Sequence, residues 1–220
     1  MSSANDRERL HAVLERAQSE GALGARPITE VIAHALDFVT ALPPDVRSVL
    51  DLGTGAGIPG LVIAWARPTV RLTLVDRRAK RIDALHRAIA QLGWDDRVTA
   101  IHADAEDLVG RPEWRAGHDA VVARGFTEPH TTLRLASQLA RHQGWVVISE
   151  PPAGTPSRWE PAWYVECHVS PPERLDRVVR FHVEHGHSSP HPVPRGTIAQ
   201  GLSPRGDDTP PEHPSGTLVV

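Results

Sequence analysis

Hydrophobic residues along the chain follow two spacings, one typical of helices and one typical of buried strands. Segments 6–18 and 28–42 repeat apolar residues every three or four positions, and Pro43-Pro44 ends the second segment. Further along, short apolar runs predict five strands, at 48–53, 71–76, 97–103, 119–123 and 145–149. Helical periods between these runs predict helices at 59–66, 77–92 and 129–141. Two later apolar runs predict a terminal hairpin, at 163–169 and 177–184.

The alternation of strands and helices decides the fold class. Strands that are joined through helices form a parallel sheet with right-handed crossovers. We therefore predict an α/β protein with a doubly wound, Rossmann-like sheet that is preceded by N-terminal helices.

Proline is concentrated late in the chain and sets the predicted boundaries. Of 20 prolines, 13 follow Glu150, and the segment from Gly186 onward has neither a helical nor a strand period. Such a composition is typical of a mobile tail. The sequence thus predicts a helical extension at 1–45, the sheet domain at 46–185 and a Pro/His-rich flexible tail at 186–220.

The composition of the chain limits the partners and the cellular compartment that we expect. With 24 Lys and Arg residues against 27 Asp and Glu, the net charge is -3, so a nucleic-acid partner would need a local basic patch. The single cysteine, Cys167, fits a reducing compartment. No apolar run reaches the ~20 residues of a membrane helix, and we expect a cytoplasmic protein without membrane contact. No metal site is expected, because no Cys or acid is ordered around the late histidines, His182, His185, His187 and His191.

The strongest chemical signal follows the first predicted strand, at 51–60, where glycines let the backbone turn sharply. Gly55, Gly57 and Gly60 satisfy G-x-G-x-x-G, the dinucleotide fingerprint. Asp51, Gly53, Gly55 and Gly57 satisfy the acidic-x-G-x-G-x-G form of class I methyltransferases, which bind S-adenosylmethionine. The acid favours the second pattern, because a sulfonium and an amino group need a nearby negative charge, whereas a pyrophosphate would be repelled.

Acidic residues also follow the second and third predicted strands. Asp76 lies 25 residues after Asp51, near the spacing of a ribose-binding carboxylate, although a helix cap would use the same residue. Asp104-Ala105-Glu106 follows the third predicted strand, where such folds bind an adenine. The same residues would also be expected if Asp104 only caps a helix.

Missing motifs narrow the reaction. Methyltransferases that act on amino groups of bases carry an Asp/Asn-Pro-Pro-aromatic loop after the fourth strand, where this chain reads Ala123-Arg124-Gly125-Phe126. Methylation of a pyrimidine carbon would need a cysteine nucleophile, and Cys167 lies beyond the catalytic strands, where a small apolar role is expected. A ring nitrogen with a free lone pair fits best, since catalysis then consists mostly of alignment.

From about residue 23 to 149 the chain resembles the small-subunit ribosomal RNA guanine-N7 methyltransferases, also called the glucose-inhibited division protein B family. The matching stretches are 51–60, 66–68, 72–76, 80–81, 105–107 and 119–124, with His34 and Asp37 upstream. The most diagnostic pieces are Ile58-Pro59-Gly60 and the isolated Arg124.

The resemblance implies the site and the partners. S-adenosylmethionine would contact the residues that match Gly53, Ile58, Ala105, Glu106 and Arg124. The resemblance also places Arg124 beside the target base, so we expect Arg124 to serve catalysis and substrate binding as well. The expected partner is 16S rRNA or the small ribosomal subunit, and a monomer is the expected state. His34 would either touch the substrate or cap the core.

The chain departs from the family at three places, and two other functions stay open. The Asn-containing segment before the His34 helix is missing, Gly125 replaces an alanine, and the fifth strand ends in Glu150 instead of Lys-Gly. An acid at the cleft should weaken phosphate binding. The alternatives are a class I methyltransferase acting on a small molecule or another RNA, and an NAD(P)-dependent oxidoreductase.

Overall fold

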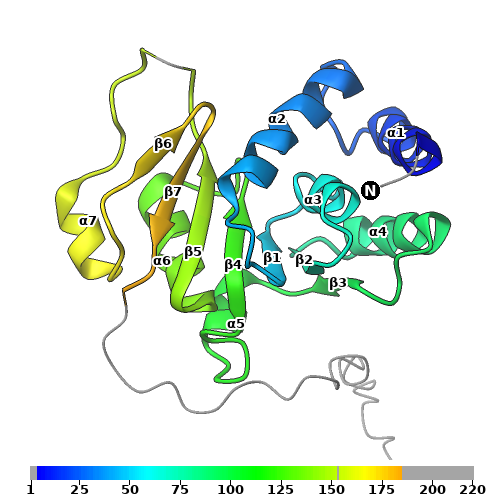
Figure 1. The fold of residues 1–220 in the computed structure, drawn as a ribbon. Coiled ribbons are helices and arrows are strands. Elements are labelled where there is room, and N and C mark those ends of the chain that lie inside the picture. The colour runs from blue at the N-terminus through cyan, green and yellow to red at the C-terminus, as the bar shows by residue number, and fades with distance from the viewer. Residues whose placement is uncertain (1–3, 153, 185–220) are drawn as a thin grey trace, which may run out of the picture.

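The computed structural model describes residues 4–152 and 154–184, in which seven strands form one sheet between helices (Figure 1). The strands are β1 (Ser48–Leu52), β2 (Arg71–Asp76), β3 (Val98–His102), β4 (His118–Ala123), β5 (Ala140–Ser149), β6 (Glu173–Leu175) and β7 (Val178–His182). The helices are α1 (Ala4–Ser19), α2 (Ile28–Ala41), α3 (Gly60–Ala66), α4 (Ala79–Leu92), α5 (Ala105–Val109), α6 (Pro129–Leu139) and α7 (Pro161–Glu166). The predicted tail at 186–220 and the histidines at 185, 187 and 191 lie outside the described residues.

The sheet confirms the α/β prediction and has the strand order β3-β2-β1-β4-β5-β7-β6. β1 to β5 are parallel to their neighbours, whereas β7 runs antiparallel to both β5 and β6. Only Asp176 and Arg177 separate β6 from β7, and so short a link reverses the chain rather than crossing the sheet. The sheet is therefore mixed at one edge.

The terminal hairpin is displaced from its predicted position. It is formed by β6 and β7, while most of the predicted first strand, at 163–169, belongs to α7. Pro161 occupies the first turn of this helix, where its missing N–H costs nothing. Only Val169 keeps a strand contact, an isolated bridge to Val183.

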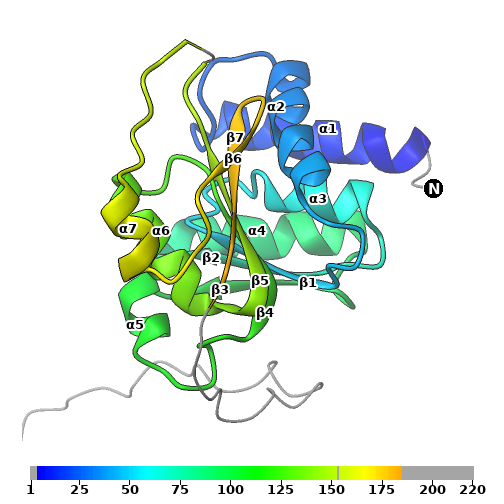
Figure 2. The same cartoon turned by 60° about the vertical axis from the view of Figure 1, so that its left-hand side comes forward.

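Alternation along each strand divides the core into two layers. Val49, Leu72 and Val122 face α1 to α4, whereas Leu50, Val75 and Val121 face α5 to α7. Figure 2 shows these two groups of helices on opposite sides of the sheet. Because α1 and α2 pack into the first layer, the predicted N-terminal extension shares its core with the sheet.

The start of β5 is earlier than predicted. Ala140 pairs with His118, and the register then shifts before Trp145 pairs with Ala120. Gly144 lies in this irregular stretch, and a Cβ there would come within 2.7 Å of the Arg141 carbonyl oxygen. The helical period of α6 thus ends at Leu139.

In the described part of the chain, no helix has the length and apolar character that crossing a membrane requires. The described His, Cys, Asp and Glu side chains include no group of three that could hold a metal ion.

Candidate active site

A cleft of about 500 Å³ opens at the carboxyl edge of the parallel strands. Its volume is in the range of small-molecule sites. Beside it the chain leaves β1 and β4 toward opposite sides of the sheet, which is where α/β folds bind their ligands. The lining comes from the segments after β1, β2, β3 and β4 and from α6: Leu52, Gly53, Val75, Asp76, Arg77, Arg78, Arg81, Ala103, Asp104, Ala105, Glu106, Gly125, Phe126, Thr127, Thr131 and Leu135.

The glycines after β1 serve two different purposes. Gly53 lines the cleft with φ +68, and a Cβ there would lie 2.3 Å from Cδ2 of Phe126. Gly57, with φ +89, packs on the core, since its Cβ would lie 2.5 Å from Cδ1 of Leu61. Ile58 is also buried in the core. Gly57 and Ile58, which were predicted to bind the cofactor, therefore do not line the cleft.

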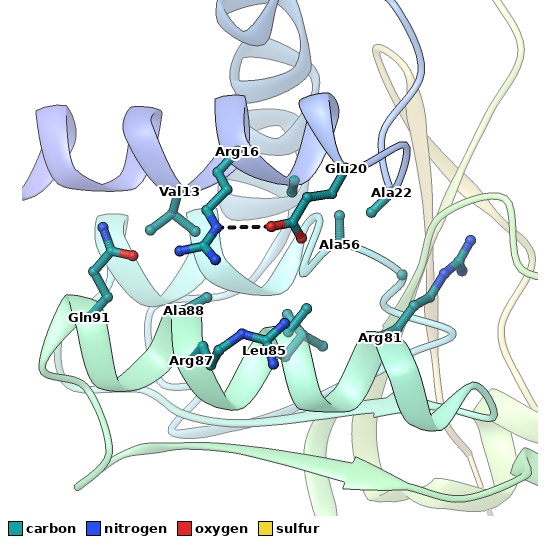
Figure 3. A pocket seen from close by; sticks show the side chains of 13 residues that line it. Val13, Arg16, Glu20, Ala22, Ala56, Arg81, Leu85, Arg87, Ala88 and Gln91 are labelled. Carbon is teal, nitrogen blue, oxygen red and sulfur yellow. Dashed lines mark hydrogen bonds and ion pairs between the residues drawn. The ribbon is translucent and has the colours of Figure 1, made fainter.

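Gly55 borders a second, smaller hollow of about 50 Å³ between α1 and α4 (Figure 3). The Arg16–Glu20 ion pair, 2.9 Å long, lies on its α1 side. Arg81 lines this hollow as well as the cleft, and Figure 3 shows its side chain extending away from the ion pair. A Cβ on Gly55 would meet only the tip of Arg81, at 3.5 Å.

Asp51 is completely buried behind the glycine loop and does not line the cleft. Its Oδ2 accepts hydrogen bonds from the Thr54 hydroxyl at 2.6 Å and the Gly60 amide at 2.8 Å. Its Oδ1 is buried without a partner among the described residues. Burial raises the pKa of the carboxyl to about 6, against the two hydrogen bonds and the positive charge of Arg124. Asp51 therefore fixes the loop, and it brings a buried acid near Arg124.

Asp76 lines the cleft and ties the loop to α4. Its Oδ2 accepts from the Gly55 amide at 3.0 Å and lies 3.3 Å from Nη1 of Arg81. Its Oδ1 accepts from the Arg78 amide at 2.9 Å, just before α4 begins. The carboxylate thus joins the glycine loop to the start of α4 at the wall of the cleft.

The segment after β3 forms the far wall of the cleft. Asp104 caps α5, because its carboxylate accepts the Glu106 amide at 3.0 Å. Ala105 is buried, whereas Glu106 is exposed and forms an ion pair of 2.6 Å with Arg134 of α6. The capping interpretation of Asp104 is confirmed, and all three residues line the cleft.

Arg124 follows β4 and leaves its Nε buried without a partner among the described side chains. The acids that precede and follow Arg124 most closely in the sequence, Asp119 and Glu128, have other partners. Asp119 pairs with Arg141 at 2.7 Å, and Glu128 caps α6 by accepting the amides of His130 and Thr131. Arg124 is therefore not explained as an ion pair that closes the strand edge.

Four ionisable side chains, those of His34, Asp37, Arg124 and Arg177, interact where α2 meets the carboxyl edge of the sheet. Nε2 of His34 is buried without a partner in the described chain. Burial lowers the pKa of His34, and the charges of Arg177 and Arg124 lower it further, against Asp37. Nε of Arg177 lies 2.7 Å from Oδ2 of Asp37. The structure thus brings His34, Asp37 and Arg124 together and adds Arg177, which no sequence signal identified.

Phe126 is the second residue that the sequence interpretation did not single out as a site residue. Its ring covers Gly53 within the cleft, and the φ of +58 at Gly125 sets the direction of the chain just before it. An aromatic two residues after the catalytic candidate was the available signal.

Glu150 does not face the cleft, which corrects the expectation of a bare acid there. Its side chain is 2% exposed. It accepts hydrogen bonds from Nε of Arg158 at 2.9 Å, Nε1 of Trp159 at 2.7 Å and Nη1 of Arg174 at 3.4 Å. Two arginines neutralise this carboxylate, so it adds no unpaired negative charge to a phosphate path.

Cys167 is buried, as a small apolar residue would be. Burial, followed by the negative charge of Glu166, raises the pKa of its thiol to about 11. The thiol is therefore protonated at neutral pH and is a poor nucleophile.

Residues 10–150 match the family described as rRNA small subunit methyltransferase G. Two curated relatives carry the name "Ribosomal RNA small subunit methyltransferase G". The protein from Clostridium kluyveri is 42% identical over 80 residues, 36% of this chain and 33% of that protein. The protein from Moorella thermoacetica is 30% identical over 125 residues, 55% of this chain and 52% of that protein. The chain thus matches about half or less of their length.

Among solved structures, an O-methyltransferase family protein from Burkholderia thailandensis has a TM-score of 0.54 and 15% sequence identity to this chain. The similarity covers 69% of this chain and 56% of that one, and it shows a shared fold.

Proposed function

The chain belongs to the rRNA small subunit methyltransferase G family, and on this basis we propose that it transfers a methyl group from S-adenosylmethionine to N7 of a guanine in 16S rRNA. The observation that carries the proposal is Arg124, whose Nε is buried near the carboxyl edge of the sheet without a partner among the residues that the structure describes. With the small ribosomal subunit as the partner, the protein would act in the cytoplasm.

The cleft fits S-adenosylmethionine in size, and its lining includes three acids and three arginines. Asp76 and Glu106 are carboxylates on its wall, and Asp51 adds a buried acid behind the loop. These acids suit a ligand with a sulfonium, an amino group and ribose hydroxyls. Asp76 would hold the ribose, Ala105 and Glu106 the adenine end, and Gly53 the part that crosses the loop. When bound, the cofactor supplies an activated methyl group.

The residues around the acceptor need only bind and orient it. N7 of guanine has a free lone pair, so no proton has to be removed before attack. Arg124 cannot act as a base, since a guanidinium stays protonated in proteins. Its planar fork can instead hold a guanine edge, whose O6 accepts hydrogen bonds. Most of the rate enhancement would then come from alignment.

Arg124→Lys tests this assignment, because it keeps the charge and removes the planar fork. Transfer of a tritiated methyl group to 30S particles and to naked 16S rRNA should fall at least tenfold, while the melting temperature is preserved. Calorimetric titration with S-adenosylmethionine shows whether the cofactor or the base loses its contact.

The matched control is Arg141→Lys, because Arg141 lies at the start of β5 and pairs with Asp119 at the amino end of β4, away from the carboxyl edge that holds the cleft. Full transfer by Arg124→Lys would refute the catalytic role. Transfer to neither RNA by the wild type, despite cofactor binding, would refute the rRNA substrate and favour another acceptor.

A further inference from the structure

The β6–β7 hairpin lies beyond residue 150, where the family match ends, yet it contacts α2, the helix that carries His34 and Asp37. Both cartoon views show the turn of this hairpin beside α2 (Figures 1 and 2). Arg180 of β7 donates from Nη1 to the carbonyl oxygen of Ala41 at 2.8 Å, and Arg177 reaches Asp37. The hairpin therefore adds Arg177 to the group that His34, Asp37 and Arg124 of the matched region form.

Arg177 is held from two sides. Its carbonyl oxygen accepts the Glu150 amide at 2.7 Å, which fixes the backbone to the end of β5. Its Nε lies 2.7 Å from Oδ2 of Asp37, so the side chain forms an ion pair with this carboxylate. Among the described residues, no hydrogen bond is donated by its two terminal nitrogens. Its side chain is 40% exposed, so those nitrogens can reach a ligand.

The surroundings of Arg177 favour an anionic ligand. Arg177 and Arg124 both act on the imidazole of His34, whose Nε2 is buried without a partner in the described chain. The nearby acids are Asp37, which forms an ion pair with Arg177, and Asp176, whose Oδ2 lies 4.0 Å from Nε of Arg177 and whose side chain is 75% exposed. The planar fork of a guanidinium matches the geometry of a phosphate, and the charges of both arginines act on the same side chain, His34.

We propose that Arg177 binds the phosphodiester next to the acceptor guanine, while Arg124 faces the base. This inference rests on the proposed rRNA substrate. Phosphate contacts set the register of a nucleic acid and leave recognition of the base to other groups. The hairpin would thus position the RNA for a reaction whose cofactor is held elsewhere.

Two variants separate a phosphate contact from a structural ion pair, because both remove the Arg177–Asp37 pair. Arg177→Gln also removes the cation, whereas Asp37→Asn keeps it. The probe is a fluorescent fragment of 16S rRNA, and its affinity is measured by anisotropy over a series of salt concentrations. We expect Arg177→Gln to bind about tenfold more weakly, with a salt slope reduced by about 1, and Asp37→Asn to bind as well as the wild type or more tightly.

The control is Arg141→Gln, which removes the same charge near the amino ends of the parallel strands, away from the cleft. This variant should leave the salt slope unchanged. Equal losses in Arg177→Gln and Asp37→Asn would overturn the proposal, since the pair would then serve only to hold the hairpin on α2. Wild-type affinity in Arg177→Gln would overturn it as well.

Failure of the inference can be told apart from failure of the proposed function. If the wild type methylates 16S rRNA and Arg177→Gln keeps the wild-type affinity and salt slope, only the phosphate contact is refuted. If the wild type binds S-adenosylmethionine but neither binds nor methylates the RNA, both are refuted. Melting curves of each variant confirm that losses do not arise from unfolding.

Discussion

Replacing Asp51 by asparagine should change how the stability of the protein depends on pH. The side chain is completely buried, and burial raises its pKa from 3.8 to about 6. The folded state therefore holds this proton more tightly than the unfolded state, so the resulting stability is present below pH 3.8 and is lost as the pH rises through 6. At about 1.4 kcal/mol per pKa unit, the loss amounts to about 3 kcal/mol.

A second buried group acts in the opposite direction. Burial lowers the pKa of His118 from 6.5 to about 4, so its contribution is present above pH 6.5 and is lost as the pH falls through 4. The wild-type curve would thus combine two opposed slopes over a similar range. The difference between the wild type and Asp51→Asn isolates the carboxyl, because His118 is present in both.

Urea unfolding at intervals from pH 4 to pH 7 measures that difference. The free energy of unfolding of the wild type, minus that of Asp51→Asn, should fall by about 2.4 kcal/mol across this range, because part of the full effect is already lost at pH 4. Asparagine keeps an oxygen to accept from Thr54 and Gly60, so the loop should retain its shape. A difference that does not vary with pH would show that the carboxyl titrates normally and that the raised pKa is wrong.

Three further changes test separate parts of the site. Asp76→Ala should weaken the binding of S-adenosylmethionine by ~1.5–3 kcal/mol, measured by calorimetry. An equal loss of affinity in the exposed control Asp83→Ala would contradict a specific contact of Asp76. Gly60→Ala should lower the free energy of unfolding by about 1–3 kcal/mol, because the new Cβ would lie 2.3 Å from Cδ2 of Leu74; an unchanged urea midpoint would show that the loop has room. Glu150→Ala should lower the free energy of unfolding by about 2 kcal/mol, because it removes the acceptor for two arginines and a tryptophan. A variant as stable as the wild type would show that these hydrogen bonds do not stabilise the fold.

Local spacing was sufficient to predict most of the strands. The predicted segments 71–76 and 119–123 match β2 and β4 to within one residue, because alternation along a buried strand leaves a clear apolar run. The same spacing could not assign tasks to the glycines. Gly53 and Gly57 belong to one motif, yet only the packing of Phe126 and Leu61 shows which of them faces the cleft.

Groups that depend on distant pairing could not be predicted. Glu150 was expected in the cleft because its partners, Arg158 and Arg174, lie outside any motif and reach it only in the folded chain. Arg177 was missed for the same reason, since antiparallel pairing of β7 with β5 brings it to α2. No local pattern encodes a contact between residues 37 and 177.

Because β6 and β7 form an antiparallel edge of the sheet, different stretches of the chain build the cleft and the surface beside α2. The cleft that suits the cofactor is built from the continuous middle of the chain, residues 52–135. The proposed acceptor side also includes α2, before that stretch, and the β6–β7 hairpin, after it. Under the proposed function, substitutions at 28–41 and 173–182 would change which nucleotide is presented without altering the residues that would hold the methyl donor, so donor use and acceptor choice could diverge independently.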